Sequence, residues 1–294
     1  MHDAGASLGQ HSSIRLERDG GVLTVTFHGD GGSPVFGPEL ALQACRAFQA
    51  IAADPGTQVV ILASAGQDIF LRSPLDAVLG TDSGSASGRR TWHSLPGTPA
   101  DQIGIGRGPA RWLLEYVLAV EAPVIAAMHG RCEIHAEIPL MSDIVLATEG
   151  LQLSDAAHIA QGMVPGDGCH AYWQAALGLS RARYFHWMGT VIDAAEALRL
   201  GIVHEIVPQE ELLPRARAIA EQLLRVPPLA RRFTRLLLAQ RMRRHLLDEY
   251  YLGYSLETLA LTEGCGTAGP EPGTGSGERR DPPPRRRRPR PAAR

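Results

Sequence analysis

The sequence of 294 residues contains no lysine, and all 29 of its basic residues are arginines. This absence excludes a lysine Schiff base, a phosphate-loop lysine and a pyridoxal-phosphate anchor. Cysteine is scarce as well, because the chain has only four, and none belongs to a C-x-x-C pair (Cys45, Cys132, Cys169 and Cys265). Their wide spacing argues against a disulfide framework and against a zinc knuckle, so we expect free thiols.

Long apolar runs and metal-binding motifs are also missing. The longest uncharged apolar runs, such as Val124–Met128, fall well short of the roughly 18 residues that span a bilayer. The N-terminus lacks the basic region and apolar stretch of a secretion signal. We therefore expect a cytoplasmic protein that does not bind a membrane. The sequence has no H-x-x-x-H, H-E-x-x-H or paired-cysteine pattern, so it predicts neither a metal nor a cofactor.

The charge is unevenly distributed along the chain. The net charge is -2, but residues 265–294 hold eight arginines against three acidic residues, which gives this tail +5 and leaves the first 264 residues at -7. The tail is rich in glycine, proline and arginine and has little apolar surface to bury, so we expect it to be disordered, like residues 1–12. Its arginines are not interleaved with aromatic residues, and no nucleic-acid partner is expected.

The first half of the foldable region alternates between strand and helix patterns. Ser13–Arg18 and Val22–Phe27 alternate apolar and polar residues around Asp19-Gly-Gly, which is typical of a β-hairpin. Apolar residues at helical spacing predict a helix over Pro38–Ala53, followed by a short buried strand over Val59–Ala63. The same rhythm predicts a second series of elements: a helix over Arg111–Ala119, a strand over Val124–Met128, a short helix over 137–142 and a strand over Ile144–Ala147.

From Ala171 onward the pattern is mostly helical. We expect a helix over Ala194–Leu200, a strand over Val203–Val207, and two long helices over Glu210–Leu224 and Leu229–Leu261. The sequence therefore predicts an α/β protein whose C-terminal third is rich in helix.

Several segments resemble motifs of the crotonase (enoyl-CoA hydratase/isomerase) superfamily. Ala122–Gly130 is similar to the family's K-P-V-I-A-A-V-N-G, Ser142–Ala147 to its C-D-x-x-x-A, and Gly162–Gly166 to its G-x-x-P-G. The resemblance covers roughly residues 13–262. It implies a crotonase-like spiral of ββα units over 13–200 and a C-terminal helical trimerisation region over 201–264, and hence a homotrimer or a dimer of trimers.

The chain departs from the hydratase pattern at several chemically important positions. Where the family has three consecutive glycines, this chain has Ile134-His135-Ala136. His158 occupies the position of a hydratase glutamate, and Asp167 replaces the small residue after Pro-Gly. In the first loop, Leu71–Asp76 replaces the usual A-G-x-D. These changes point away from enoyl-CoA hydration.

With these departures the chain resembles the β-diketone hydrolases of the superfamily, a group that includes 6-oxocamphor hydrolase. That resemblance implies cleavage of a carbon–carbon bond in a β-diketone, in most cases a cyclic one, by a retro-Claisen reaction that needs neither coenzyme A nor a metal. It also implies catalytic roles for His135, His158, Asp167 and Glu257. One further histidine of the group, near the first loop, has no counterpart here, because no histidine lies between His28 and His93.

The chemistry of the reaction fits these residue types. Imidazole, with an ordinary pKa of about 6.5, accepts a proton from water near neutral pH better than a glutamate with a pKa of about 4.3. We therefore expect His158 to be the general base, Asp167 to fix its tautomer, His135 to donate to the oxyanion or the enolate, and Glu257 to be an auxiliary polar group.

Each of these residues also has a purely structural interpretation. His158 can be interpreted as a surface histidine, and Asp167 as an aspartate that caps a turn. In the same way, His135 can be a polar loop residue and Glu257 a solvated charge on a helix. Glu137 matches a hydratase acid, but we favour a role in capping or orienting the short helix that it begins.

Two other functions remain open at this point. The first is an acyl-CoA hydratase, isomerase or thioesterase that uses Glu137. The second is a non-catalytic trimeric scaffold whose arginine-rich tail recruits an acidic partner.

Overall fold

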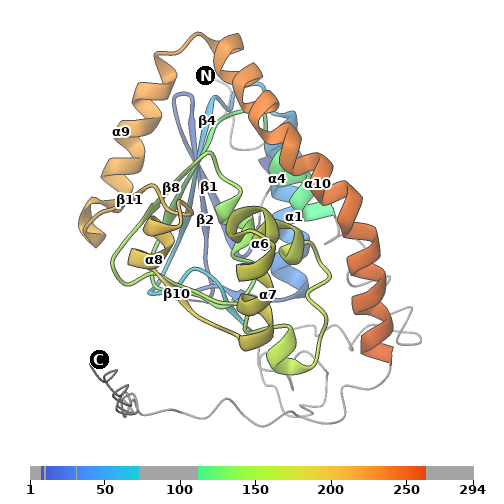
Figure 1. Ribbon diagram of the computed structural model, residues 1–294. Helices are drawn as coiled ribbons and strands as arrows, with labels where there is room; N and C mark the ends of the chain where they lie inside the picture. The colour runs from blue at the N-terminus through green and yellow to red at the C-terminus, as the bar shows by residue number, and fades with distance from the viewer. Residues whose placement is uncertain (1–7, 10, 31, 73–111, 263–294) are drawn as a thin grey trace, which may run out of the picture.

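A six-stranded sheet forms the centre of the protein, of which the computed structural model describes residues 8–9, 11–30, 32–72 and 112–262. β1 runs antiparallel to β2, and every other neighbouring pair in this sheet is parallel. The mixed α/β architecture expected from the sequence is therefore confirmed. From one edge to the other (Figure 1), the strands are β1 (Ile14–Asp19), β2 (Val22–Phe27), β4 (Val59–Ser64), β6 (Val124–Met128), β8 (Ile144–Ala147) and β11 (Glu205–Ile206).

Shorter elements complete the fold. Two small sheets pair β3 (Val35–Phe36) with β5 (Leu71–Arg72), and β9 (Gln152–Leu153) with both β7 (Arg131–Cys132) and β10 (Ile192–Asp193). The described helices are α1 (Pro38–Ala53), α4 (Leu113–Ala119), α5 (Glu137–Leu140), α6 (Cys169–Leu177), α7 (Leu179–Met188), α8 (Ala194–Arg199), α9 (Leu212–Leu224) and α10 (Pro228–Thr262), with the 3-10 turns η4 (Ile159–Gln161) and η5 (Gln209–Glu211).

The large sheet is buried on both faces. On one face, Val59 and Ile61 of β4 pack against α9, whose apolar residues recur at helical spacing. On the other face, Val60 and Leu62 of the same strand pack with residues of α1 and α4. Figure 1 shows α9 to the left of the sheet, and α1 and α4 to its right. Burial on both faces explains why these strands read as continuous apolar runs.

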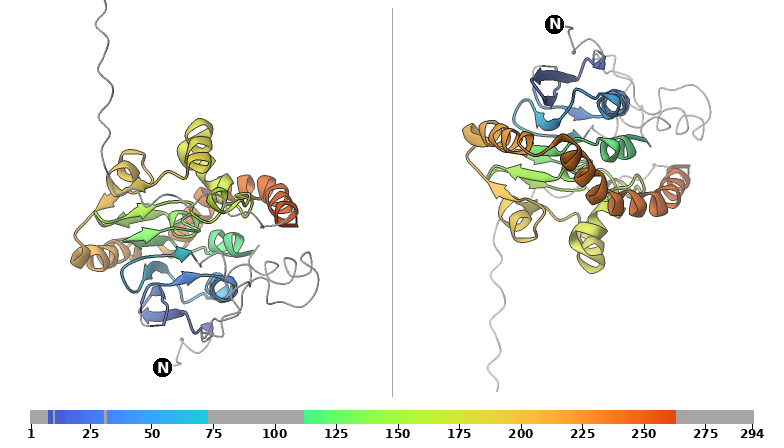
Figure 2. Two further views of the ribbon diagram at one scale, coloured as in Figure 1. Left: turned by 90° about the horizontal axis from the view of Figure 1, so that it is seen from below. Right: turned by 90° about the horizontal axis from the view of Figure 1, so that it is seen from above.

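Helix α10 is fixed to the sheet by the buried guanidinium of Arg235. Its Nη1 donates to Asp143 Oδ1 at 2.9 Å, and Asp143 Oδ2 accepts from the backbone N–H of Val124 in β6 at 2.8 Å. A buried arginine is tolerated only with such partners, since an uncompensated buried charge is strongly destabilising. In the view from above, α10 crosses the width of the molecule (Figure 2). This anchorage determines where the C-terminal half of α10 lies.

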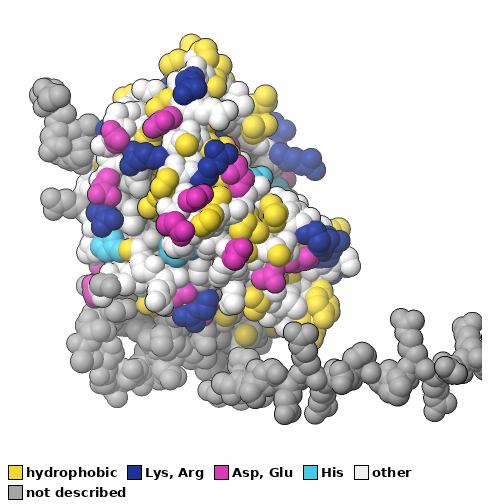
Figure 3. Space-filling model, turned by 90° about the vertical axis from the view of Figure 1, so that its left-hand side faces the viewer, with side chains coloured by type: hydrophobic (Ala, Val, Ile, Leu, Met, Phe, Trp, Pro, Cys, Tyr) yellow, Lys and Arg dark blue, Asp and Glu magenta, His cyan; other side chains and the backbone are white. Residues whose placement is uncertain are grey.

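The surface on the side of α9 carries charges of both signs. Figure 3 shows acidic and basic side chains interspersed there, and two ion pairs, Arg215–Glu205 and Arg217–Asp19, involve α9. None of the helices among the described residues is long and apolar enough to cross a membrane. The described cysteines, Cys45, Cys132 and Cys169, are free thiols, as expected.

The terminal segments for which we expect disorder lie mainly outside the described residues. These are the tail over 265–294 and most of residues 1–12. Leu8 is described, however, and is buried in the main core. Packed residues therefore begin before Ser13.

Candidate active site

One cavity is lined by all four residues that the sequence singles out: His135, His158, Asp167 and Glu257. The rest of the described lining is mainly apolar and aromatic, and it contains no arginine. It consists of Phe36, Ala41, Leu113, Leu114, Ile134, Ile138, Ala157, Met163, Tyr250 and Tyr254. A mostly apolar cavity with a few convergent polar groups is the usual form of a small-molecule site.

His158 lies where the chain leaves β9 and enters η4, and its side chain is 3% exposed. Its two ring nitrogens face two different carboxylates: Nδ1 lies 2.6 Å from Asp155 Oδ1, and Nε2 lies 3.3 Å from Asp167 Oδ2. The interpretation of His158 as a surface histidine is therefore wrong. His158 lies close to Asp167, as expected, but the contact is made by Nε2. The partner of Nδ1 is Asp155, which is not among the residues that the sequence points to.

The charge of the His158 imidazole is set by opposing effects. Burial by itself disfavours the imidazolium, but the carboxylates of Asp155 and Asp167 outweigh it and raise the pKa of His158 well above its ordinary value. Burial also raises the pKa of the Cys169 thiol well above its usual range, so this group stays protonated at neutral pH.

Asp167 combines a turn contact with a site contact. Its Oδ1 accepts a hydrogen bond from the backbone N–H of Cys169 at 3.3 Å, at the start of α6. Its Oδ2 lies 3.3 Å from His158 Nε2 and 3.4 Å from His135 Nδ1. The turn-capping interpretation is therefore correct for one oxygen, while the other is placed between two imidazoles.

His135 occupies a backbone conformation that favours glycine, with φ at 52°. A non-glycine residue in this region is strained, and such strain is concentrated at functional sites. The ring packs against the tilted ring of Phe36, with centroids 4.2 Å apart, and Glu137 Oε1 lies 2.8 Å from its Nδ1. Burial opposes its charge, yet Asp167 and Glu137 raise the pKa of His135.

Glu137 does not cap α5. The cap position of that helix is Ala136, which makes no side-chain capping hydrogen bond, and Glu137 instead accepts from the His135 ring. Of our interpretation that Glu137 caps or orients the short helix, the capping part is thus wrong, although Glu137 does lie in the first turn of α5. Its carboxyl group is 1% exposed and orients His135.

Glu257 is 1% exposed, so it is not a solvated helical charge. It reaches the cavity because α10 approaches the Pro165–Asp167 loop through two glycines. A Cβ on Gly166 would lie 2.0 Å from the carbonyl oxygen of Gly253 and 2.8 Å from the Cβ of Glu257. The absence of both side chains lets α10 come close enough to bring Glu257 to the wall of the site.

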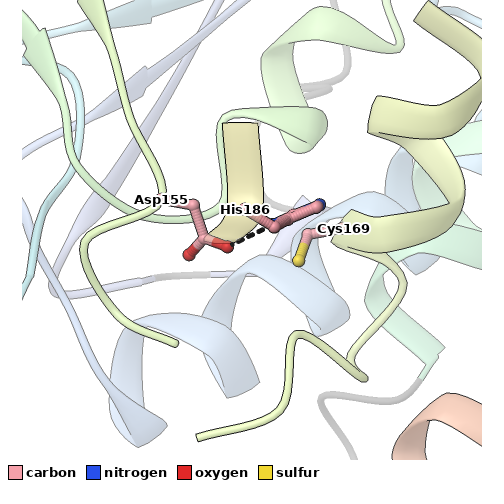
Figure 4. Close-up of side chains that lie close together, drawn as sticks. All are labelled: Asp155, Cys169 and His186. Carbon is pink, nitrogen blue, oxygen red and sulfur yellow. Dashed lines mark hydrogen bonds and ion pairs between the residues drawn. The ribbon is translucent and has the colours of Figure 1, made fainter. Parts of the chain in front are cut away.

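The sequence analysis missed two residues behind His158. Asp155 and His186, which lies on α7, are both buried, and Asp155 Oδ2 is 2.9 Å from His186 Nδ1 (Figure 4). Asp155 precedes His158 by three residues, and this D-x-x-H spacing was the only local signal available. His186 is 31 residues from Asp155, so no local pattern connects the two residues.

Within the part of the chain that the structure describes, three overlapping groups of side chains have possible ligand atoms within 4.8 Å of one another: Asp155, Cys169 and His186; His158, Asp167 and Cys169; and His135, Glu137 and Asp167. Figure 4 shows the first of them, with the Cys169 sulfur beside the Asp155–His186 hydrogen bond. In every group a carboxylate faces an imidazole nitrogen. The arrangement forms one continuous chain of alternating imidazoles and carboxylates: His186, Asp155, His158, Asp167, His135 and Glu137.

Comparison with known proteins identifies the family. The family model described as enoyl-CoA hydratase/isomerase matches residues 17–257. The chain belongs to this family, which is part of the crotonase superfamily. Its α/β fold is accordingly the crotonase fold, as the sequence motifs predicted.

One solved structure combines similarity in fold and in sequence. It is ABDH, a β-diketone hydrolase from the cyanobacterium Anabaena sp. PCC 7120 bound to (S)-3-oxocyclohexyl acetic acid, with a TM-score of 0.76 and 32% identity over 86% of this chain and 95% of that one. An enoyl-CoA hydratase/isomerase from Mycobacterium paratuberculosis, with a TM-score of 0.73 over 85% of this chain and 93% of that one, is only 21% identical and supports the crotonase fold alone.

Other members of the family are described as hydratases. Crotonyl-CoA hydratase of Syntrophomonas wolfei is 26% identical over 76% of this chain and 80% of its own length. A probable enoyl-CoA hydratase of Mycobacterium leprae is 35% identical, but the match spans 35% of this chain and only 40% of that protein.

Proposed function

We propose that this member of the enoyl-CoA hydratase/isomerase family hydrolyses a carbon–carbon bond of a β-diketone by a retro-Claisen reaction. The observation that carries the proposal is the position of Asp167 Oδ2, 3.3 Å from His158 Nε2 and 3.4 Å from His135 Nδ1, at the wall of a mostly apolar cavity. The similarity to the Anabaena β-diketone hydrolase supports it. The described lining holds carboxyl groups and no arginine, which suits an uncharged substrate.

In the first step, His158 Nε2 removes a proton from a water molecule while the water oxygen bonds to one ketone carbon. The resulting tetrahedral oxyanion needs hydrogen-bond donors, and such donors act most strongly in a site that excludes water. Asp167 stabilises the imidazolium that forms, since its Oδ2 faces Nε2. Two carboxylates, Asp155 and Asp167, then flank the charged ring.

In the second step, the bond between the attacked carbon and the central carbon breaks. Its electron pair forms the enolate of the second ketone, and the attacked carbon becomes a carboxylic acid. His135 donates to the enolate oxygen through Nε2, because its Nδ1 is held by Glu137 and Asp167. The proton on His158 passes to the central carbon, and the product is a keto acid. Glu257 supplies a further polar group at the cavity wall.

The decisive experiment compares two substrate classes. We expect purified protein to convert at least one member of a panel of mono- and bicyclic 1,3-diketones to its keto acid, followed by loss of diketone absorbance and by mass spectrometry. Crotonyl-CoA, tested under the same conditions, should not be hydrated. Hydration of crotonyl-CoA without turnover of any diketone would overturn the proposal in favour of an acyl-CoA enzyme that uses Glu137.

The pH dependence of the reaction follows from the two imidazoles. They share Asp167 and therefore titrate as a coupled pair, whose active form combines a neutral His158 with a charged His135. Because the neighbouring acidic groups raise the pKa of His158, the fraction in which His158 is neutral grows as the pH rises. We expect kcat/KM to give a bell-shaped profile whose ascending limb lies above the ordinary imidazole pKa of about 6.5. A profile that is flat across neutral pH would contradict this assignment.

We further propose that the protein assembles as a homotrimer or a dimer of trimers through its C-terminal helices. Large apolar side chains are exposed on the isolated chain along α7 and α10: Leu179, Tyr184, Trp187 and Met188 on α7, and Leu229, Phe233, Leu237, Leu238, Leu252, Leu256 and Leu259 on α10. Exposed apolar area on this scale marks an interaction surface. Sedimentation equilibrium should give three or six chains per particle, and a monomer would contradict the proposal.

A further inference from the structure

The chain of alternating imidazoles and carboxylates extends away from the cavity, behind His158. Asp155 uses both carboxylate oxygens, because Oδ1 lies 2.6 Å from His158 Nδ1 and Oδ2 lies 2.9 Å from His186 Nδ1. Neither Asp155 nor His186 is among the described residues that line the cavity. Their hydrogen-bonded link to the described cavity lining runs through His158.

The Asp155 carboxylate determines where the His158 ring carries its proton. An ionised carboxylate only accepts hydrogen bonds, so a neutral imidazole that contacts it must present an N–H group. Burial favours protonation of Asp155, but hydrogen bonds and charge from His158 and His186 together lower the pKa of Asp155 below its ordinary value. Asp167 makes the same demand on Nε2, but its Oδ2 lies 3.3 Å from that atom, whereas Asp155 Oδ1 lies 2.6 Å from Nδ1, so the neutral His158 ring keeps its proton on Nδ1. Nε2, which faces Asp167 and the cavity, is the atom at which a proton is gained and lost.

His186 in turn fixes Asp155. It belongs to α7, and its ring packs edge-on against Phe185 with centroids 5.3 Å apart. Its Nε2 is buried and has no hydrogen-bond partner among the described residues, so Nδ1 is the nitrogen through which the ring donates, and Asp155 accepts from it. A buried nitrogen without a partner lowers stability, and an apolar side chain would avoid this penalty. The imidazole at this position is therefore better explained by its hydrogen bond to Asp155 than by packing.

We propose that Asp155 and His186 are positioning residues, which hold His158 from behind in the tautomer and ring orientation that point a basic Nε2 at the substrate water. This inference rests on the proposed function of His158. It assigns to Asp155 the orienting role that the sequence led us to expect of Asp167. Asp167 instead faces Nε2, the nitrogen that takes part in proton transfer. Among the described residues, the titratable groups that face His158 are Asp155, Asp167 and Cys169, with His135 beyond Asp167.

The first test replaces Asp155 by asparagine. Asp155→Asn should lower kcat by about 100-fold or more, because an amide can donate to Nδ1 and so stabilise the wrong tautomer. It should also move the ascending limb of the pH profile to lower pH, since a negative charge that favours the imidazolium is removed. His186→Gln should lower kcat by roughly 10-fold. His245→Gln is the matched control: His245 lies 3.1 Å from the carbonyl oxygen of Ala171 and is not among the described residues that line the cavity, so its replacement should change neither kcat nor the ascending limb of the pH profile.

A purely structural role would give a different result. In that case Asp155→Asn and His186→Gln would lower the melting temperature but leave the ascending limb in place, and the proposal would be overturned. The nitrogen-15 chemical shifts of the His158 ring provide a readout that does not depend on turnover. We expect an Nδ1–H tautomer in the neutral ring of the unmodified protein and loss of this preference in Asp155→Asn. An Nε2–H tautomer in the unmodified protein would refute the inference even if no diketone is hydrolysed.

Discussion

His158→Gln is expected to lower kcat for hydrolysis of a cyclic 1,3-diketone by about 100- to 10,000-fold, the range typical of a lost general base. Glutamine has an amide that can hydrogen bond to Asp155 or Asp167, but it cannot accept a proton from water. Initial rates at saturating diketone measure the effect. The melting temperature should change much less than activity, because the glutamine side chain keeps polar contacts in the same space.

His245→Gln serves as the control for this variant as well, since it removes a partly buried imidazole on α10 that does not line the cavity. A fall of less than 10-fold in the His158 variant would contradict the assignment of the general base. Water would then have to be activated by another group at the cavity, of which Asp167 and Glu257 are the described acidic candidates.

Gly166→Ala is expected to disturb the site through the backbone. The new Cβ would meet the Gly253 carbonyl oxygen at 2.0 Å and the Glu257 Cβ at 2.8 Å, and a backbone atom cannot move aside as the end of a flexible side chain can. Either α10 or the loop that carries Asp167 must shift. Overpacking of this kind destabilises by about 1–3 kcal/mol, and misplacement of catalytic groups by about 1 Å can lower the rate by about 100-fold. We therefore expect a lower melting temperature and a kcat/KM reduced by about 100-fold.

Gly150→Ala is the matched control, because a Cβ on Gly150 would have no heavy atom within 4 Å. Its effect on stability should stay within about 0.5 kcal/mol, as for most surface substitutions, with kcat/KM unchanged. If Gly166→Ala behaves like this control, the close contact between α10 and the Pro165–Asp167 loop does not position the site.

The sequence predicts most of the regular structure, because the signals involved are local. The hairpin of β1 and β2, helix α1 with Pro38 at its first position, and the long helices α9 and α10 all follow from apolar periodicity and turn residues. The two-residue strand β11 lies within the predicted Val203–Val207, but others, such as β3 and β10, were not predicted, since each is defined by its partner rather than by a pattern of its own. Their pairing depends on tertiary contacts that a local pattern does not contain.

The same difference between local signals and tertiary contacts applies to the candidate site. Substitutions at family motif positions pointed to His135, His158 and Asp167, and the structure places these side chains together. Which nitrogen of His158 faces which carboxylate is a matter of three-dimensional orientation, and sequence spacing could not decide between Asp155 and Asp167. Glu137 was taken as a helix cap because its position at the start of α5 is local information, whereas its contact with the strained His135 is a product of the folded loop.

The retro-Claisen step itself is tested most directly by turnover of a cyclic 1,3-diketone in water enriched in oxygen-18, with the product analysed by mass spectrometry. We expect a keto acid that carries one oxygen-18 atom in its new carboxylate, beyond the label that the ketones exchange without enzyme, and formation of this product at least about 100-fold more slowly with His158→Gln. Recovery of every diketone uncleaved by the unmodified protein, or equal cleavage by the variant, would contradict this expectation.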